Sequence, residues 1–122
     1  MGDVRGLGLF IGVELVWPPG TKEPATAHAK FVKDSLRERS VLVSTDGPYD
    51  NTLKIKPPMC FSIEDAAQLV RELAEVLRVD LPPKAKELEH KEAGLQAALR
   101  AATKPSPVDG KVESGAVPVA RL

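Results

Sequence analysis

Apolar side chains alternate with glycines in one short stretch near the start of the chain. Residues 5–15 read RGLGLFIGVEL. Successive side chains of a strand point to opposite faces, so the odd-numbered residues from 7 to 15 share one apolar face. They are Leu7, Leu9, Ile11, Val13 and Leu15, while the other face carries Gly6, Gly8, Phe10, Gly12 and Glu14. The pattern predicts one continuous strand with a glycine-lined face.

The glycine-lined face has two interpretations. Glycine weakens a strand by about 0.5–1 kcal/mol relative to alanine, so several on one face indicate that another backbone or a partner domain approaches closely there. Alternatively, the glycines mark a bulge or a bend. A dinucleotide-binding loop is disfavoured, because the glycine spacing has one residue too many for G-x-G-x-x-G and strand formers follow where a helix should begin.

Helical periodicity first appears in residues 25–39. The apolar positions are Ala25, Ala29, Val32 and Leu36, with Phe31 beside them. The preceding loop, residues 17–24, reads WPPGTKEP, and its three prolines exclude regular pairing. Trp17 is predicted to cover an edge of the core. His28 has no second candidate ligand nearby and is predicted to be solvated.

Two further strands are predicted at residues 41–45 and 52–56. The first, VLVST, ends at the turn signal DGP. The second, TLKIK, places Leu53 and Ile55 on one side and Lys54 and Lys56 on the other. The lysines are interpreted as solvated protection of a sheet edge, with anion binding by one of them as the alternative.

Pro57 and Pro58 must end this last strand or leave it at a sheet edge. Cys60 follows in an apolar context and is predicted to be a buried thiol that packs as a small hydrophobe. Ser62 then begins a second helix, with Asp65 three residues later as in a capping box. Its apolar stripe is predicted to contain Ile63, Ala66, Val70, Leu73 and Leu77, widened by Leu69 and Val76. The helix is predicted to end before LPPK, residues 81–84.

The order strand, helix, strand, strand, helix predicts an α+β domain over residues 1–81, with a small antiparallel or mixed sheet and the helices on one face. Residues 82–103 read as a charged helical extension whose thin apolar seam is interrupted by Gly94. We expect a solvated helix there, with weak partner binding as the alternative. Residues 104–122 lack apolar periodicity and are predicted to be a disordered tail.

Composition excludes several classes of function. The 17 basic and 17 acidic residues leave a net charge of zero, which argues against nucleic acid or an anionic membrane as the main partner. One cysteine excludes an intrachain disulfide and a multi-cysteine zinc site, and favours a reducing compartment. No membrane span, signal peptide, catalytic triad or phosphate-binding loop is present in the pattern. A strand that opens directly after Met1 leads us to expect that the chain begins within a larger protein.

Two stretches carry a resemblance to a known family. Residues 2–15 and residues 52–66, with VLVSTDGP between them, resemble the C-terminal small domain of class III, fold-type I pyridoxal-phosphate enzymes. Within that family, DGP followed by LKIKPPMCF most resembles the phospho-lyase branch. The resemblance covers residues 2–80 or so and leaves the rest of the chain unmatched.

This resemblance implies a small domain that closes over pyridoxal phosphate held mainly by a large domain and by the second subunit of a homodimer. The family binds the cofactor through a Schiff-base lysine, an aspartate on the pyridinium nitrogen and a phosphate cup, all in the large domain. We therefore assign no catalytic, cofactor-binding or metal-binding residue in this chain. Alone, the chain is predicted to be inactive.

Lys54 is the one residue for which the resemblance implies a substrate role. Aminotransferases of this class usually carry an arginine there, which grips a substrate carboxylate or pairs with a glutamate. Lysine lacks the bidentate fork, which puts ordinary α-carboxylate recognition in doubt. We expect Lys54 to face the active-site entrance and hold an anionic substrate group.

The resemblance implies elimination of phosphate from a phosphorylated amino alcohol or hydroxy amino acid, which yields an aldehyde, ammonia and phosphate. A class III aminotransferase is the first alternative. A stand-alone regulatory module that binds a small ligand is the second. The expected location is intracellular, in mitochondria or cytoplasm.

Overall fold

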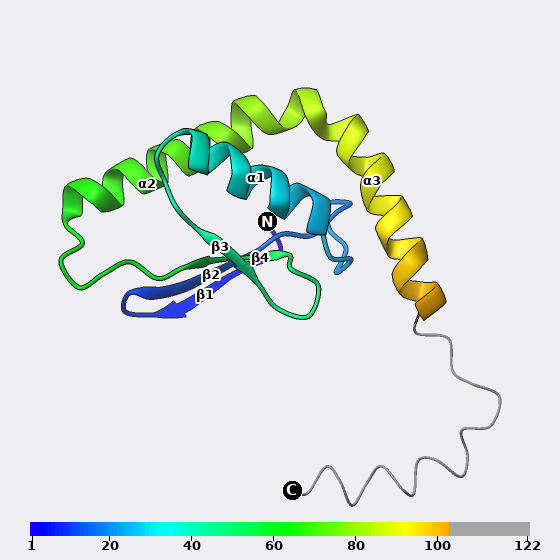
Figure 1. The fold of residues 1–122 in the computed structure, drawn as a ribbon, viewed down its shortest axis with the longest axis horizontal. Helices are drawn as coiled ribbons and strands as arrows, with labels where there is room; N and C mark the ends of the chain where they lie inside the picture. The colour runs from blue at the N-terminus through cyan, green and yellow to red at the C-terminus, as the bar shows by residue number, and fades with distance from the viewer. Residues whose placement is uncertain (103–122) are drawn as a thin grey trace, which may run out of the picture.

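The computed structural model describes residues 1–102. Its elements are β1 (Asp3–Leu7), β2 (Phe10–Glu14), α1 (Thr26–Glu38), β3 (Ser44–Asp46), β4 (Thr52–Ile55), α2 (Ile63–Glu75), the π-helical segment η1 (Val76–Asp80) and α3 (Leu81–Ala102). The strands form one antiparallel sheet in the order β1-β2-β4-β3, and α1 and α2 lie on one side of it (Figure 1). The predicted α+β class is confirmed. The tail predicted at 104–122 lies outside the described residues.

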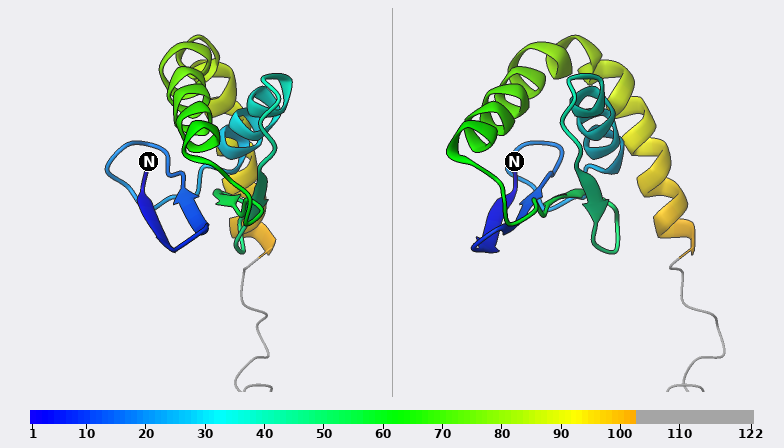
Figure 2. Two further views of the ribbon diagram at one scale, coloured as in Figure 1. Left: turned by 90° about the vertical axis from the view of Figure 1, so that its left-hand side faces the viewer. Right: turned by 60° about the vertical axis from the view of Figure 1, so that its left-hand side comes forward.

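The stretch RGLGLFIGVEL forms a hairpin, so the prediction of one continuous strand is wrong. Leu7 pairs with Phe10, which leaves Gly8 and Leu9 as a two-residue turn. Gly8 has a φ of 57°, a left-handed conformation that glycine adopts at no steric cost. The bend interpretation of the glycines is therefore correct at this position. The hairpin lies at the opposite end of the molecule from the last turns of α3 (Figure 2).

The hairpin also separates the glycines that a single strand would place together. Directly opposite residues share a face, so Gly12 lies on the face with Arg5, and Gly6 on the face with Ile11. A Cβ on Gly6 would collide with the Phe10 carbonyl oxygen and lie 2.9 Å from the Ile11 Cα. Another backbone does approach this glycine closely, but it belongs to the neighbouring strand of the same hairpin.

The core lies between the sheet and the helices. The strands contribute Val13, Leu53 and Ile55, and Leu15 follows directly after β2. α1 with its preceding residue contributes Ala25, Ala29, Val32 and Leu36. The predicted stripe of α1 and the predicted alternation of β4 are both confirmed. Trp17 packs against this core, as predicted.

The β3 strand is shorter than predicted and begins only at Ser44. β4 pairs with β2 on one side and with β3 on the other, so it lies inside the sheet. The interpretation of Lys54 as protection of a sheet edge is therefore wrong, whereas Lys56 lies beyond the end of β4 and is solvated, as predicted. Cys60 is exposed rather than buried, because it lies in a turn after the chain has left the sheet at Ile55.

The capping box that opens α2 is confirmed. The Ser62 N–H donates to Asp65 Oδ2 at 2.9 Å, and the Asp65 N–H donates to Ser62 Oγ at 3.1 Å. The predicted apolar stripe is only partly correct, because Ile63 and Val70 are 85% and 65% exposed. Contact with the core is made by Leu69, Leu73, Val76 and Leu77. A helix packed on one side can bury only one sector, and the predicted stripe was wider than that sector.

The second helix does not end before LPPK. It continues through η1 into α3, and α2, η1 and α3 together form an arch over α1 (Figure 1). Pro82 and Pro83 fall in the first turn of α3, directly after η1, and neither residue has an N–H to donate to the preceding turn. Most side chains of α3 are exposed, but Leu88 and Glu92 are buried. No helix within residues 1–102 is both long and apolar enough to cross a membrane.

His28 is buried at the contact between α1 and α3, so the prediction of a solvated side chain is wrong. It is 3% exposed, its Nδ1 lies 3.1 Å from Glu92 Oε2, and its ring stacks on Trp17 with centroids 5.0 Å apart. Glu92 is 64 residues further along the chain. Local sequence gives no sign of a partner at that separation.

Candidate functional site

The face of the sheet that points away from the helices carries Lys54, the residue predicted to bind substrate. We call this the open face. The strand register places Arg5, Gly12 and Lys54 directly opposite one another on three successive strands. Since Gly12 has no side chain, the row has a gap between its two cations. The neighbouring row holds Asp3, Glu14, Thr52 and Asp46.

Each cation of the open face is paired with carboxylates from that neighbouring row. Lys54 Nζ lies 2.7 Å from Asp46 Oδ2. Arg5 Nη1 lies 2.8 Å from Asp3 Oδ2 and 2.9 Å from Glu14 Oε2. All these groups except Lys54 and Glu14 are more than half exposed, so the pairs orient the side chains more than they stabilise the fold.

These contacts shift the proton affinities of two groups. The hydrogen bond from Lys54, followed by that from the Gly47 N–H, lowers the pKa of the Asp46 carboxyl. Hydrogen bonds to Glu14 and then Asp3 raise the pKa of the Arg5 guanidinium. Both shifts favour the charged forms, of Asp46 and of Arg5 respectively.

A hollow of about 520 Å³ lies over this row. Its lining includes Arg5, Phe10, Gly12, Asp46, Thr52 and Lys54. Lys56 lies beside it, with Nζ 5.9 Å from the centroid of the Phe10 ring. The hollow thus combines an apolar side with cations and carboxylates. It suits a small ligand that carries charges of both signs.

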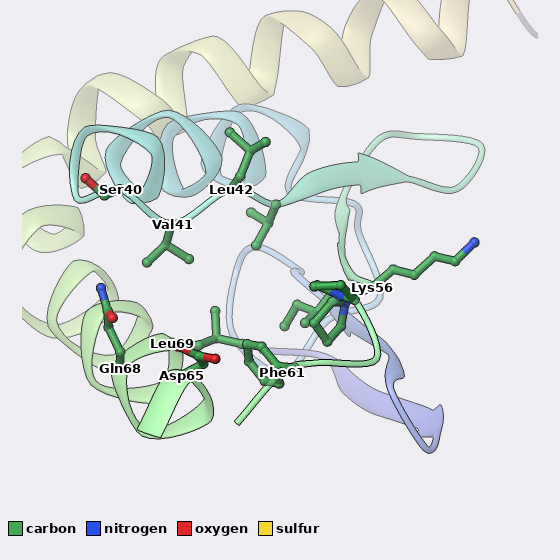
Figure 3. A pocket seen from close by; sticks show the side chains of 12 residues that line it. Ser40, Val41, Leu42, Lys56, Phe61, Asp65, Gln68 and Leu69 are labelled. Carbon is green, nitrogen blue, oxygen red and sulfur yellow. The ribbon is translucent and has the colours of Figure 1, made fainter. Parts of the chain in front are cut away.

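A second cleft, of about 410 Å³, lies between α2, the end of β4 and the segment that follows α1. In Figure 3, Val41 and Leu69 face each other across it, Phe61 closes one side, and the Lys56 side chain extends away from it. Asp65 lines the cleft, but its carboxylate accepts from the N–H of Ser62, and this contact lowers the pKa of Asp65. The cleft is mainly apolar, and we assign no chemistry to it.

The described residues do not fit pyridoxal phosphate. A phosphate cup commonly uses free N–H groups at a helix N-terminus. Here the carboxylate of Glu92 already occupies the N-terminus of α1, and Ser62 with Asp65 caps α2. Lys54, on the open face, is paired with Asp46. We therefore derive no chemical step through the cofactor from this chain.

Two features of the site were missed by sequence reasoning. The sequence did contain a signal for the pairing of Asp46 with Lys54. The turn that begins with DGP joins β3 to β4, and the antiparallel pairing of these strands brings the two residues to one face. The sequence contained no local signal for the burial of His28 against Glu92, because this contact depends on where α3 lies. Within residues 1–102, no group of three or more His, Cys, Asp and Glu side chains could hold a metal ion.

Comparison with known proteins gives homologues over most of the folded part. No protein-family model matches the chain. The alanine–glyoxylate aminotransferase 2-like protein of Drosophila melanogaster is 45% identical over 78 residues, 63% of this chain and 16% of the relative. The ethanolamine-phosphate phospho-lyase homolog 1 of Caenorhabditis elegans is 42% identical over 78 residues, 63% of this chain and 17% of the relative.

A solved structure extends the comparison to the fold. The phospholyase from Arthrobacter, determined in complex with phosphoethanolamine, is 43% identical with a TM-score of 0.53. The match covers 59% of this chain and 18% of that structure. The chain thus spans less than a fifth of the length of each of these relatives.

Proposed function

On the premise that the homologues of this chain are members of the class III aminotransferase family, we propose that it forms the small-domain part of a pyridoxal-phosphate-dependent phospho-lyase. The observation that carries this proposal is the 43% identity to a phospholyase whose structure was determined with phosphoethanolamine. The proposed substrate is a phosphorylated amino alcohol or hydroxy amino acid. The products are an aldehyde, ammonia and inorganic phosphate.

The proposal places the cofactor in a large domain and a second subunit outside this chain. When bound there, the cofactor supplies the electron sink that such an elimination needs. This chain supplies the open face, where Lys54 holds the anionic group of the substrate. Asp46 orients the Lys54 ammonium through their contact at 2.7 Å. A lysine acts as a point charge and suits a phosphate, whereas planar carboxylate recognition favours arginine.

The test is a chimera in which this chain replaces the matching segment of the Arthrobacter phospholyase. Phosphate release from phosphoethanolamine is measured beside amino transfer to a keto acid. We expect phosphate release, and we expect Lys54→Ala to lower kcat/KM about tenfold or more, as loss of one charge-assisted contact does. Lys30→Ala is the matched control, since Lys30 is an exposed lysine of α1, on the side of the sheet opposite the open face.

The outcomes separate the two enzyme classes. If the chimera releases phosphate and Lys54→Ala does not change kcat/KM, the proposed lyase activity stands and the proposed role of Lys54 is wrong. Amino transfer without phosphate release would instead support the aminotransferase alternative, which the similarity to the Drosophila relative favours.

A further inference from the structure

A buried carboxylate from α3 sits at the N-terminus of α1. The N–H of Thr26 donates to Glu92 Oε1 at 2.7 Å, and the N–H of Ala27 donates to Glu92 Oε2 at 2.8 Å. His28 Nδ1 lies 3.1 Å from the same Oε2. Glu92 and His28 are 2% and 3% exposed. Three groups of one helical turn thus converge on both oxygens of a single carboxylate.

The first turn of α1 has no capping group of its own. The N-cap residue is Ala25, which makes no side-chain cap, and the first turn contains no acidic residue. The first N–H groups of a helix have no partner inside it, and the helix dipole favours a negative charge there. Glu92 therefore performs from another helix the role that Asp or Ser usually performs at the N-cap.

His28 makes the site selective for a hydrogen-bond acceptor. A carboxylate only accepts hydrogen bonds, so Nδ1 is the donor in this contact. Nε2 is buried with no hydrogen-bond partner among residues 1–102, and Trp17 stacks on the ring at an interplanar angle of 23°. Among residues 1–102, Glu92 provides the hydrogen bond that offsets the cost of burying the His28 imidazole.

The arch formed by α2, η1 and α3 contacts the rest of the fold along its length. Near its middle, Arg39 bonds Glu72 of α2 at 3.1 Å and Asp80 of η1 at 2.9 Å. Further along, Glu92 and Leu88 are the buried residues of α3. The π-helical segment η1 lies within the stretch bounded by the two residues that Arg39 bonds, and such a conformation is rare in helices and frequent at functional sites.

α3 also contacts the loop before α1 through Gln96 Nε2, which donates to the Pro24 carbonyl at 3.5 Å, and through Arg100 Nη2, which lies 3.8 Å from Glu23 Oε2. These contacts are long or exposed, so the buried Glu92 carboxylate makes the strongest of these polar contacts.

We propose that the N-terminus of α1, together with His28, is a carboxylate-binding site that Glu92 occupies, and that its occupancy decides whether α3 stays packed on α1. The ligand is a carboxylate, supplied here by the chain itself. Emptying the site by truncating Glu92 frees α3 and leaves a space into which a small free carboxylate such as acetate fits. This inference is independent of the proposed enzymatic function.

The experiment uses the full chain with Glu92→Ala, and Glu87→Ala as the matched control. Glu87 is an exposed carboxylate on the same helix, paired with Lys91 at 2.7 Å. Hydrogen exchange of the α3 amides should accelerate about tenfold or more in Glu92→Ala, and by less than about twofold in Glu87→Ala, because buried charge-assisted contacts are worth more than exposed pairs. Exchange of the β4 amides should change less than that of α3.

Chemical rescue then identifies the site. Acetate should restore slow exchange of α3 in Glu92→Ala along a saturable curve, whereas acetamide, which has the same shape and no charge, should not. Emission from Trp17, the single tryptophan of the chain, should follow the same curve, because its ring contacts His28. Equal exchange of α3 in both alanine variants, or equal effects of acetate and acetamide, would overturn the proposal.

A second variant covers the case in which Glu92→Ala does not fold. Glu92→Gln keeps the side-chain length and one acceptor oxygen while it removes the charge. We expect α3 exchange about threefold faster than in Glu87→Gln, which corresponds to losing part of a charged contact. Indistinguishable exchange in the two glutamine variants would also overturn the proposal.

Discussion

Replacing Gly6 with alanine tests the hairpin directly. In the structure, a Cβ on Gly6 would collide with the Phe10 carbonyl oxygen and lie 2.9 Å from the Ile11 Cα. Both neighbours are backbone atoms of β2, so β1 and β2 must separate or change register. Overpacking of this kind costs about 1–3 kcal/mol, and backbone neighbours that cannot rotate away put the expected loss of unfolding free energy near the upper end, about 3 kcal/mol.

Alanine at the other two hairpin glycines gives the comparison. A Cβ on Gly12 would lie 3.2 Å from Thr52 Cγ2, a side-chain methyl, and alanine gains about 0.5–1 kcal/mol over glycine in a strand, so Gly12→Ala should be close to neutral. Gly8 has open space around it but a φ of 57°, so Gly8→Ala should cost about 1–2 kcal/mol in backbone strain. The expected order of destabilisation is Gly6, then Gly8, then Gly12.

Urea unfolding followed by far-ultraviolet circular dichroism measures these differences. The midpoint should fall most for Gly6→Ala, with an unchanged slope if the unfolded state is unaffected. A single continuous strand would place all three glycines on one face and predict similar effects. Equal midpoints for Gly6→Ala and Gly12→Ala would refute the hairpin reasoning.

Three further predictions concern the open face and the core. Because Lys54 is the main cause of the lowered pKa of Asp46, Lys54→Ala should move that pKa back toward its ordinary value in a carboxyl NMR titration, and no movement would contradict the pairing. Because the pKa of Asp46 is lower in the folded state, Asp46 contributes stability above its unfolded pKa of about 3.9, and this stability is lost as the pH falls through the folded pKa. Asp46→Asn should therefore weaken the dependence of the unfolding free energy on acid pH. Leu53→Ala should cost about 2–5 kcal/mol, because Leu53 is fully buried. Ile63→Ala, at an 85% exposed position, should change stability by less than about 0.5 kcal/mol in the same assay, and comparable losses would contradict the packing of α2.

The sequence alone determined those features that depend on neighbours along the chain. The stripe of α1, the alternation of β4 and the capping box of Ser62 are written in spacings of two, three and four residues. Short motifs also carried the resemblance to the class III aminotransferase family, to which the homologues belong. In each case the deciding interaction lies within one or two turns or along one strand, so local pattern contains the information.

Tertiary structure decided the features that depend on partners distant in sequence. Glycines in RGLGL are compatible with both a strand and a turn, and only the pairing of β1 with β2 selects the turn at Gly8. His28 reads as a surface residue until α3 brings Glu92 to it across 64 residues. Lys54 acquires its neighbour Gly12 only when β4 lies beside β2. The physical reason is the same in each case, because burial and charge pairing depend on which elements meet in space. Spacing along the chain specifies only which side chains lie on the same face of an element.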